Sequence, residues 1–224
     1  MFGVFGSAKP EWKYDEISTP KTEEDYKSVG QEILRKRSEL IHDDNGWTTV
    51  SCPENEDDIT AVKIEQKVIN SSIATVRVTG YVKLEGKTIK ELAKELFDPT
   101  EESRKKLYTS VVSYDKLKDI NPYINVGRTV GESTGITNRE LLAMRILNKI
   151  KNGYLIGVES INDENIPFDP SCVRGVNRSG VQLSSVTDSI VQIISVDFID
   201  PKGWVPGMVI NSFISSAGDW IKRL

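Results

Sequence analysis

Two arginines stand among apolar residues where strands are expected, and buried guanidinium groups could bind an anion. In the segment 123–132 Arg128 alternates with apolar residues, and in the segment 140–150 Arg145 does the same. Alternate residues of a strand share one face, so both guanidinium groups are expected to point inward. The apolar residues expected beside them are Ile124, Val126, Ala143 and Leu147.

A lone buried charge is costly unless it has a partner. The inward arginines therefore predict a polar partner, such as a bound phosphate or hydroxyl group, water, or the carboxylates of Glu132 and Glu159. Two alternatives stay open. The arginines could form a structural ion pair. The inward face could also be displaced by one residue, because the other face offers an equally apolar stripe of Leu142, Met144 and Ile146.

The single histidine, His42, precedes Asp43 and Asp44, a combination that suits a metal or acid–base site. A solvated helix end, where an imidazolium complements the helix dipole, explains the same residues and is favoured. No Ser-His-Asp triad can be assembled without His42.

Two further segments only partly match binding motifs. Gly86-Lys87-Thr88 resembles part of a phosphate loop, but Tyr81 stands where that motif needs glycine. The acidic run 54–58 lacks the ligand alternation of a calcium loop. The sequence therefore predicts no catalytic residue, no metal and no cofactor.

The composition of the 224-residue chain, 38% hydrophobic and 28% charged, is typical of a soluble globular protein. The net charge of −4 argues against nucleic acid as a partner. No apolar run approaches the roughly 20 residues of a membrane span, and the first residues do not resemble a signal peptide. Cys52 and Cys172 form no CxxC motif. These features predict a cytoplasmic chain with free thiols.

The order of expected elements predicts an α+β domain over residues 22–224, after a flexible lead-in of residues 1–21. A helix is expected from Thr22 to just before Asp43, because Thr22 begins a capping box. Strands at 47–52, 58–68 and 72–83, helices at 88–97 and 100–107, and five or six strands within 109–200 follow. Asn152-Gly153 predicts a hairpin turn. The absence of βαβ alternation indicates an antiparallel sheet.

The last expected element is a helix that opens at 204–206 and runs to the C-terminus, roughly 18 residues or about 27 Å long. Its apolar residues cover more than one side. Such a helix either caps a protein core or covers an apolar ligand.

The segment Asp200-Pro-Lys-Gly-Trp-Val-Pro-Gly-Met-Val-Ile-Asn211 resembles the signature "D-x-K-G-x-(I/V/L)-P-x-x-(I/V)-(I/V)-N" that closes START domains, the steroidogenic-acute-regulatory-related lipid-transfer family. Weaker likenesses occur in the family's order at Asp44–Trp47, Leu92–Asp98, Asn138–Arg145 and Val173–Asn177. The chain departs from the family pattern at Leu107-Tyr108, where Trp-Asp is usual, and at Glu140, where Asp is frequent.

This resemblance implies a helix-grip fold, in which a curved antiparallel sheet wraps around a long C-terminal helix and encloses a hydrophobic tunnel for one lipid. A phospholipid is favoured, with a sterol or ceramide as other ligands. Arg128 and Arg145 are expected at its polar end, and Met208, Asn211 and Ser212 are expected ligand contacts. Ile136, Trp204 and Val205 are expected to form a gate that touches membranes transiently.

The resemblance implies non-enzymatic lipid binding and transfer by a monomer. Two alternatives stay open. Polyketide cyclases and aromatases use the same cavity for catalysis, which needs a positioned acid or base. A regulatory module would instead sense its bound lipid.

Overall fold

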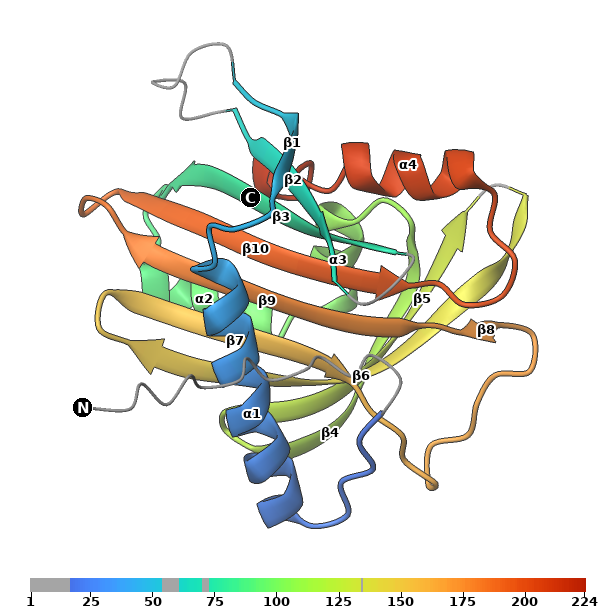
Figure 1. Ribbon diagram of the computed structural model, residues 1–224. Helices are drawn as coiled ribbons and strands as arrows, with labels where there is room; N and C mark the ends of the chain where they lie inside the picture. The colour runs from blue at the N-terminus through green and yellow to red at the C-terminus, as the bar shows by residue number, and fades with distance from the viewer. Residues whose placement is uncertain (1–16, 54–60, 70–72, 134) are drawn as a thin grey trace, which may run out of the picture.

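The computed structural model describes residues 17–53, 61–69, 73–133 and 135–224, and shows one curved sheet with helices on both faces (Figure 1). The sheet order is β1-β2-β3-β10-β9-β7-β6-β5-β4, and all of these neighbours pair antiparallel. The short strand β8 pairs parallel with β6. The strands are β1 (Thr48–Ser51), β2 (Lys63–Val68), β3 (Ala74–Lys83), β4 (Val111–Asn121), β5 (Ile124–Ser133), β6 (Ile136–Ile150), β7 (Gly153–Ser160), β8 (Val173–Arg174), β9 (Val176–Ser185) and β10 (Ile190–Asp200). The predicted fold class is confirmed.

The helices of the described residues are α1 (Glu23–Ile41), α2 (Ile89–Phe97), α3 (Glu101–Leu107), α4 (Gly207–Ser215) and the 3₁₀ turn η1 (Ile221–Arg223). Thr22 and Thr88 each form a complete capping box, which satisfies backbone N–H groups at the starts of α1 and α2. None of the helices described here is long and apolar enough to cross a membrane. The acidic run 54–58, the starts of the second and third predicted strands, and residues 1–16 lie outside the described ranges.

Helix α1 packs against the face of the sheet that we call the outer face. A Cβ built on Gly157 would lie 2.6 Å from Ile33 Cγ2, and one on Gly180 would lie 2.7 Å from Arg37 Cβ. Both glycines therefore let α1 approach the strands closely. The apolar residues of this interface include Ile33, Ile124, Val126, Leu142, Met144 and Ile146.

The opposite, inner face carries the larger core, under α2, α3 and the C-terminal segment. Its members include Val76, Val78, Leu92, Phe97, Leu107, Leu147, Ile156, Leu183, Ile193, Trp220 and Ile221. Helix α4 lies on the side of the sheet away from α1 (Figure 1), and none of its residues is buried.

The C-terminal helix is shorter than the sequence predicted. Helix α4 ends at Ser215, and the chain continues through turns to η1. The hydroxyls of Ser215 and Ser216 both donate to Ser212 O, at 3.1 and 2.8 Å, and such bonds compete with helical geometry. The chain then packs closely against the inner core at Gly218, where an added Cβ would lie 2.7 Å from Val62. The break allows Trp220 and Ile221 to enter the inner core.

Candidate functional site

A cavity of about 340 Å³ lies between the inner face, α3 and the C-terminal segment. Its apolar wall includes Val76, Leu96, Leu141, Ile156, Val158, Val181, Ile210, Phe213, Ile214 and Trp220. Pockets for small organic ligands have this apolar character, with a few polar groups that fix orientation.

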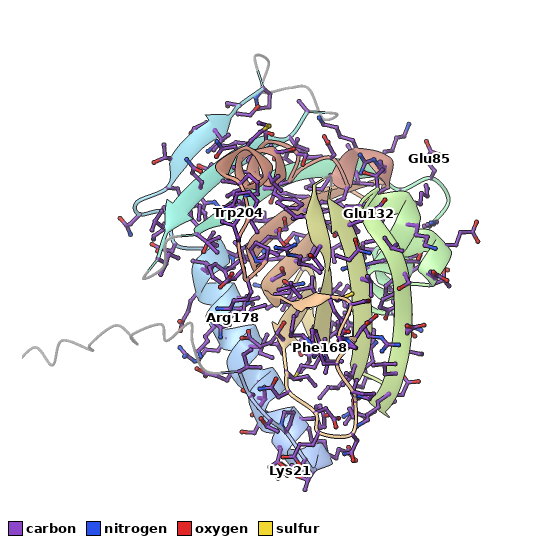
Figure 2. The ribbon with its side chains drawn as sticks, turned by 90° about the vertical axis from the view of Figure 1, so that its right-hand side faces the viewer. Lys21, Glu85, Glu132, Phe168, Arg178 and Trp204 are labelled. Carbon is purple, nitrogen blue, oxygen red and sulfur yellow. The ribbon has the colours of Figure 1, made fainter. Side chains whose placement is uncertain are left out.

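Helix α4 is a loosely packed cover on this cavity. Ile210, Phe213 and Ile214 line the space, whereas Met208 is 81% exposed on the helix surface. Just before α4, Trp204 is 78% exposed. Figure 2 shows Trp204 and Glu132 at the same end of the molecule as α4, opposite Lys21.

Arg139, near the start of β6, holds the segment that leads into α4. Arg139 Nε donates to Pro201 O at 3.1 Å, and its Nη2 donates to Lys202 O and Trp204 O at 3.2 and 3.3 Å. Ile136, at the start of β6, lines the cavity. These contacts place the start of β6 beside the segment that leads into α4, the region where Ile136, Trp204 and Val205 are expected to form a gate.

Arg145 is the most deeply buried cation of the cavity, with 2% of its surface exposed. Its Nη1 donates to Tyr114 Oη at 3.0 Å, and the guanidinium carbon lies 4.9 Å from the Tyr114 ring centroid. Gly127 makes room for this pair, because an added Cβ would lie 2.5 Å from Nη1. Burial, with repulsion from Arg104, lowers the pKa of Arg145 to about 10. The group therefore stays charged at neutral pH.

Arg104, on α3, is the second cation of this cavity wall. Its guanidinium carbon lies 4.4 Å from the Tyr108 ring centroid. Its Nε is buried and has no hydrogen-bond partner among the described residues. No carboxylate of the described chain lies within ion-pair distance of Arg104 or Arg145. The two arginines therefore present cationic donors to the cavity.

Asp197, on β10, lines the same cavity from another wall. Ser195 Oγ donates to Asp197 Oδ2 at 2.8 Å. Burial raises the pKa of this carboxyl above its ordinary value, and the hydroxyls of Ser179 and Ser195 oppose that effect. On β9, Ser179 Oγ donates to Asn177 Oδ1 at 2.5 Å. This wall therefore carries a small hydrogen-bonded polar cluster.

Several predicted site residues lie on the inner face. Arg145 and Ile136 line the cavity. Leu147 belongs to the inner core, and Ala143 shares the face of Arg145 and Leu147 because it alternates with them along β6.

The face predicted for Ile124, Val126 and Arg128 is wrong. The cross-strand partners of Ile124 and Val126 are Ile146 and Met144, and all four pack under α1. Arg128 lies on this outer side, where its Nη2 bonds to Asp115 Oδ2 at 3.1 Å near the surface. The true inward face of β5 is offset by one residue and carries Asn125, Gly127, Thr129 and Gly131.

Three residues predicted on the last helix as ligand contacts do not line the cavity. Met208, Asn211 and Ser212 are exposed, because the helical phase of α4 points Ile210, Phe213 and Ile214 inward. Trp204 and Val205 lie outside the cavity wall as well.

Sequence reasoning missed Arg104, Asn177, Ser179 and Asp197. A signal existed for Asp197, because it alternates with Val191, Ile193 and Ser195 along a strand whose inward face is apolar at its other end. No comparable signal marked Arg104, which lies in a short charged helix.

Other candidate chemistry lies away from this cavity. His42 is exposed at the end of α1, with Nδ1 2.7 Å from Ser38 O. A second hollow, of about 390 Å³, surrounds the start of α1 and has a mainly polar wall that includes Tyr26, Lys118 and Asp163. Lys118 and Asp163 pair with each other there. Cys52 and Cys172 are free thiols, exposed and buried respectively.

Comparisons with known proteins agree on one family. The family model described as START domain matches residues 29–218. The human StAR-related lipid transfer protein 5 is 18% identical, with a TM-score of 0.74 over 88% of this chain and 95% of that chain. Human STARD10 is 18% identical, with a TM-score of 0.72 over 93% of this chain and 80% of that chain.

A bacterial structure shows the same fold. The STAR-related lipid transfer protein from Xanthomonas axonopodis is 17% identical, with a TM-score of 0.66 over 80% of this chain and 96% of that chain. At such identities the likeness establishes the fold alone. No curated protein matches the chain in sequence.

Proposed function

This chain belongs to the START domain family. We propose that the protein binds one phospholipid in its inner cavity and carries it between membranes without covalent chemistry. Two of the similar structures are named as lipid transfer proteins: the human StAR-related lipid transfer protein 5 and the STAR-related protein from Xanthomonas axonopodis. The observation that carries the proposal is the cavity itself, which has an apolar wall, the buried Arg145 and the half-buried Arg104, neither with a carboxylate partner among the described residues.

The apolar wall accounts for the extraction of a lipid tail. Each methylene group that moves from water into such a wall contributes about 0.8 kcal/mol. Ile156, Val158 and Val181 on the sheet face Phe213 and Ile214 on α4 across this space. The tail is therefore expected between the inner face and α4.

The arginines account for the choice of a phosphate-bearing head. Charge-assisted hydrogen bonds to phosphate are strong in a low-dielectric site. Arg145 already has a tyrosine partner on one nitrogen, and its remaining donors suit an anionic head better than a bare sterol.

Loading requires the cover to move, because a volume of about 340 Å³ is at the small end of ligand pockets. We expect α4 to swing outward between two anchors. Arg139 holds the segment before it, and the buried Trp220 holds the chain after it. Ile136 and Trp204 lie beside this opening and are proposed to meet the membrane interface, where tryptophan is favoured.

The test is extraction by delipidated protein from liposomes that contain phospholipids, sterol and ceramide, followed by mass spectrometry of the bound molecule. One unmodified phospholipid per protein is expected. Failure to take up any lipid across this panel would overturn the proposal. Uptake without transfer to acceptor liposomes would favour a sensing module over a carrier.

A cyclase-like enzyme is the second candidate, and Asp197 is the observation that favours it. A cavity carboxyl with a raised pKa is what a general acid requires. His42 does not line this space. The same mass spectrometry separates the two functions, because an enzyme would release an altered molecule.

A further inference from the structure

The guanidinium group of Arg145 points toward the edge strand β4 rather than toward the middle of the sheet. It lies over Gly127 on β5, where an added Cβ would come within 2.5 Å of Nη1 and 2.8 Å of Tyr114 Cε2. Nη1 donates to Tyr114 Oη on β4 at 3.0 Å. Helix α3 leads into β4 and packs on it. The positive charge of Arg145 is therefore carried toward α3.

Arg104 brings a second guanidinium group to the cavity from α3. Its guanidinium carbon lies 4.4 Å from the Tyr108 ring centroid, and Tyr108 stacks on the buried Trp220 with 6.1 Å between the ring centroids. Burial and repulsion from Arg104 both lower the pKa of Arg145, so the two cations act on each other at this end of the cavity. Like charges in a low-dielectric space are costly unless an anion compensates them.

Most carboxylates near this end of the cavity have other partners or lie in solvent. Asp98, which follows α2, pairs with Lys116 at 3.0 Å. Asp219 Oδ2 lies 4.0 Å from Arg223 Nη2. Glu132 is exposed. In the described part of the chain, none of these carboxylates lies within ion-pair distance of either cavity arginine.

Among the described residues, Asp197 is the remaining carboxyl of the cavity wall. It accepts a hydrogen bond from Ser195 Oγ at 2.8 Å, and burial raises its pKa, which favours the neutral form. Arg104 and Arg145 supply two positive charges, whereas Asp197 supplies at most one negative charge. Arg139, which donates to backbone carbonyls before α4, adds to this excess. The cavity therefore keeps an excess of positive charge for a ligand to compensate.

We propose that the cavity selects an acidic phospholipid, one whose headgroup has a net negative charge, and that its phosphate binds between Arg104 and Arg145. This inference rests on the proposed phospholipid cavity and names the charge class of the headgroup. The head of phosphatidic acid or phosphatidylglycerol compensates the excess positive charge. A choline or ethanolamine head carries its own ammonium group, which cancels the phosphate charge and leaves the excess in place.

The donors at this end of the cavity suit a phosphate group. Arg104 Nε is buried and has no hydrogen-bond partner among the described residues, and Arg145 uses one nitrogen on Tyr114. Thr129, which pairs in register with Tyr114, adds a hydroxyl to the cavity wall. Arginine binds phosphate oxygens through paired, charge-assisted hydrogen bonds. One arginine can pair with the phosphate of any phospholipid, but two need a net negative charge. Arg104 is therefore the residue expected to distinguish acidic from zwitterionic heads.

The experiment gives the delipidated full chain vesicles that contain equal amounts of four phospholipids with identical chains, and identifies the bound lipid by mass spectrometry. The four are phosphatidic acid, phosphatidylglycerol, phosphatidylcholine and phosphatidylethanolamine. All of them compete on one surface, so the charge of the vesicle affects their uptake equally. Wild type should take up each acidic lipid about tenfold more than either zwitterionic lipid, which is the effect of one charge-assisted contact.

Arg104→Gln should bring the ratio of acidic to zwitterionic uptake close to one, while uptake of phosphatidylcholine is retained. Lys105→Gln is the matched control, because it removes the same charge from the next residue of α3. Lys105 is exposed and pairs with Glu101 at 2.8 Å, so this variant should keep the wild-type ratio. Urea unfolding of both variants checks that α3 stays folded.

The wild-type ratio needs no variant, so the test stands if Arg104→Gln fails to fold. Zwitterionic uptake equal to or above acidic uptake by wild type overturns this inference and leaves the phospholipid cavity standing. An equal fall of the ratio in Arg104→Gln and Lys105→Gln also overturns it, because the preference would then come from the overall charge of the protein. No uptake of any phospholipid overturns both proposals.

Discussion

The two faces of the sheet bury guanidinium groups in different ways. On the outer face, Arg37 and Arg178 both pair with Glu159, and Arg178 Nε lies 2.7 Å from Glu159 Oε1. On the inner face, Arg145 instead donates a hydrogen bond to the hydroxyl of Tyr114. The outer guanidinium groups share a carboxylate within the chain, whereas Arg145 has no carboxylate partner among the described residues.

The helices that cover the two faces differ in how many of their side chains are buried. Helix α1 buries Tyr26, Ile33, Arg37 and Leu40, among others, whereas α4 buries no residue. Buried side chains make the opening of a segment costly. We therefore expect α1 to stay closed on the outer face, whereas α4 is the cover that we propose opens.

The largest effect is expected from Glu159→Gln, which removes the carboxylate that two buried guanidinium groups share. Removal of one partner from a buried ion pair costs about 3–5 kcal/mol. The free energy of unfolding, measured with urea, should fall by about that amount. The comparison is with Arg145→Met, which removes a desolvated charge that has no carboxylate partner among the described residues.

Arg145→Met should leave stability unchanged or slightly raised, because its burial lowers the pKa of the guanidinium and so opposes folding in the charged form. If Glu159→Gln loses no more stability than Arg145→Met, the two faces do not differ in the way described.

The second effect is on binding. Arg145→Met should weaken phospholipid binding by at least about tenfold, because one charge-assisted contact is lost. Arg128→Met is the matched control, since Arg128 lies one strand away and pairs with Asp115 on the outer side. Equal losses in both variants, measured as equilibrium binding of a short-chain phospholipid, would show that Arg145 does not contact the lipid.

The contrast between the faces also explains what sequence could predict. The helix starts at Thr22 and Thr88 were predictable because capping is local. The inward face of β5 was not. Apolar residues usually mark the inward face, but here they pack under α1, and the cavity side carries Gly127 and Thr129 to leave space. In the sequence, a strand that lines a cavity therefore shows its less apolar face on the cavity side.

The C-terminal signature identified the family but not the path of the last helix. Apolar residues continue past Ser215, so the pattern predicted one long helix. The structure breaks it because Trp220 and Ile221 must reach the core beside Val62. Likewise, Asp197 pairs with Ser179 on a neighbouring strand only after folding, so the alternation along its own strand could mark Asp197 as inward but not the polar cluster that spans β9 and β10.

A third, smaller effect concerns pH and the empty cavity. Because the folded pKa of Asp197 is raised above its unfolded value, its stabilising contribution is complete below the unfolded pKa and is lost as pH rises through the folded pKa. Asp197→Asn removes this titration. In delipidated protein, the Tm of the variant should rise relative to wild type as pH increases from about 4, the ordinary pKa of an aspartate, by about 2–4 °C for each kcal/mol.

The measurement is the difference in Tm between the two delipidated proteins at each pH of this range. A constant difference in Tm across the pH range would mean that Asp197 does not titrate in this window.

The smallest effect is expected at the cover, from Trp204→Ala. Trp204 is 78% exposed and does not line the cavity, so equilibrium binding of a short-chain lipid should be unchanged. A tryptophan at a membrane interface contributes to docking through its amphipathic ring, and its loss should slow transfer between liposomes a few-fold. Tyr123→Ala is the matched control, because Tyr123 is 62% exposed at the other end of β5 from the cavity mouth. Equal transfer rates for Trp204→Ala and wild type would separate the start of α4 from membrane docking and leave α4 as a cover that opens without help from the bilayer.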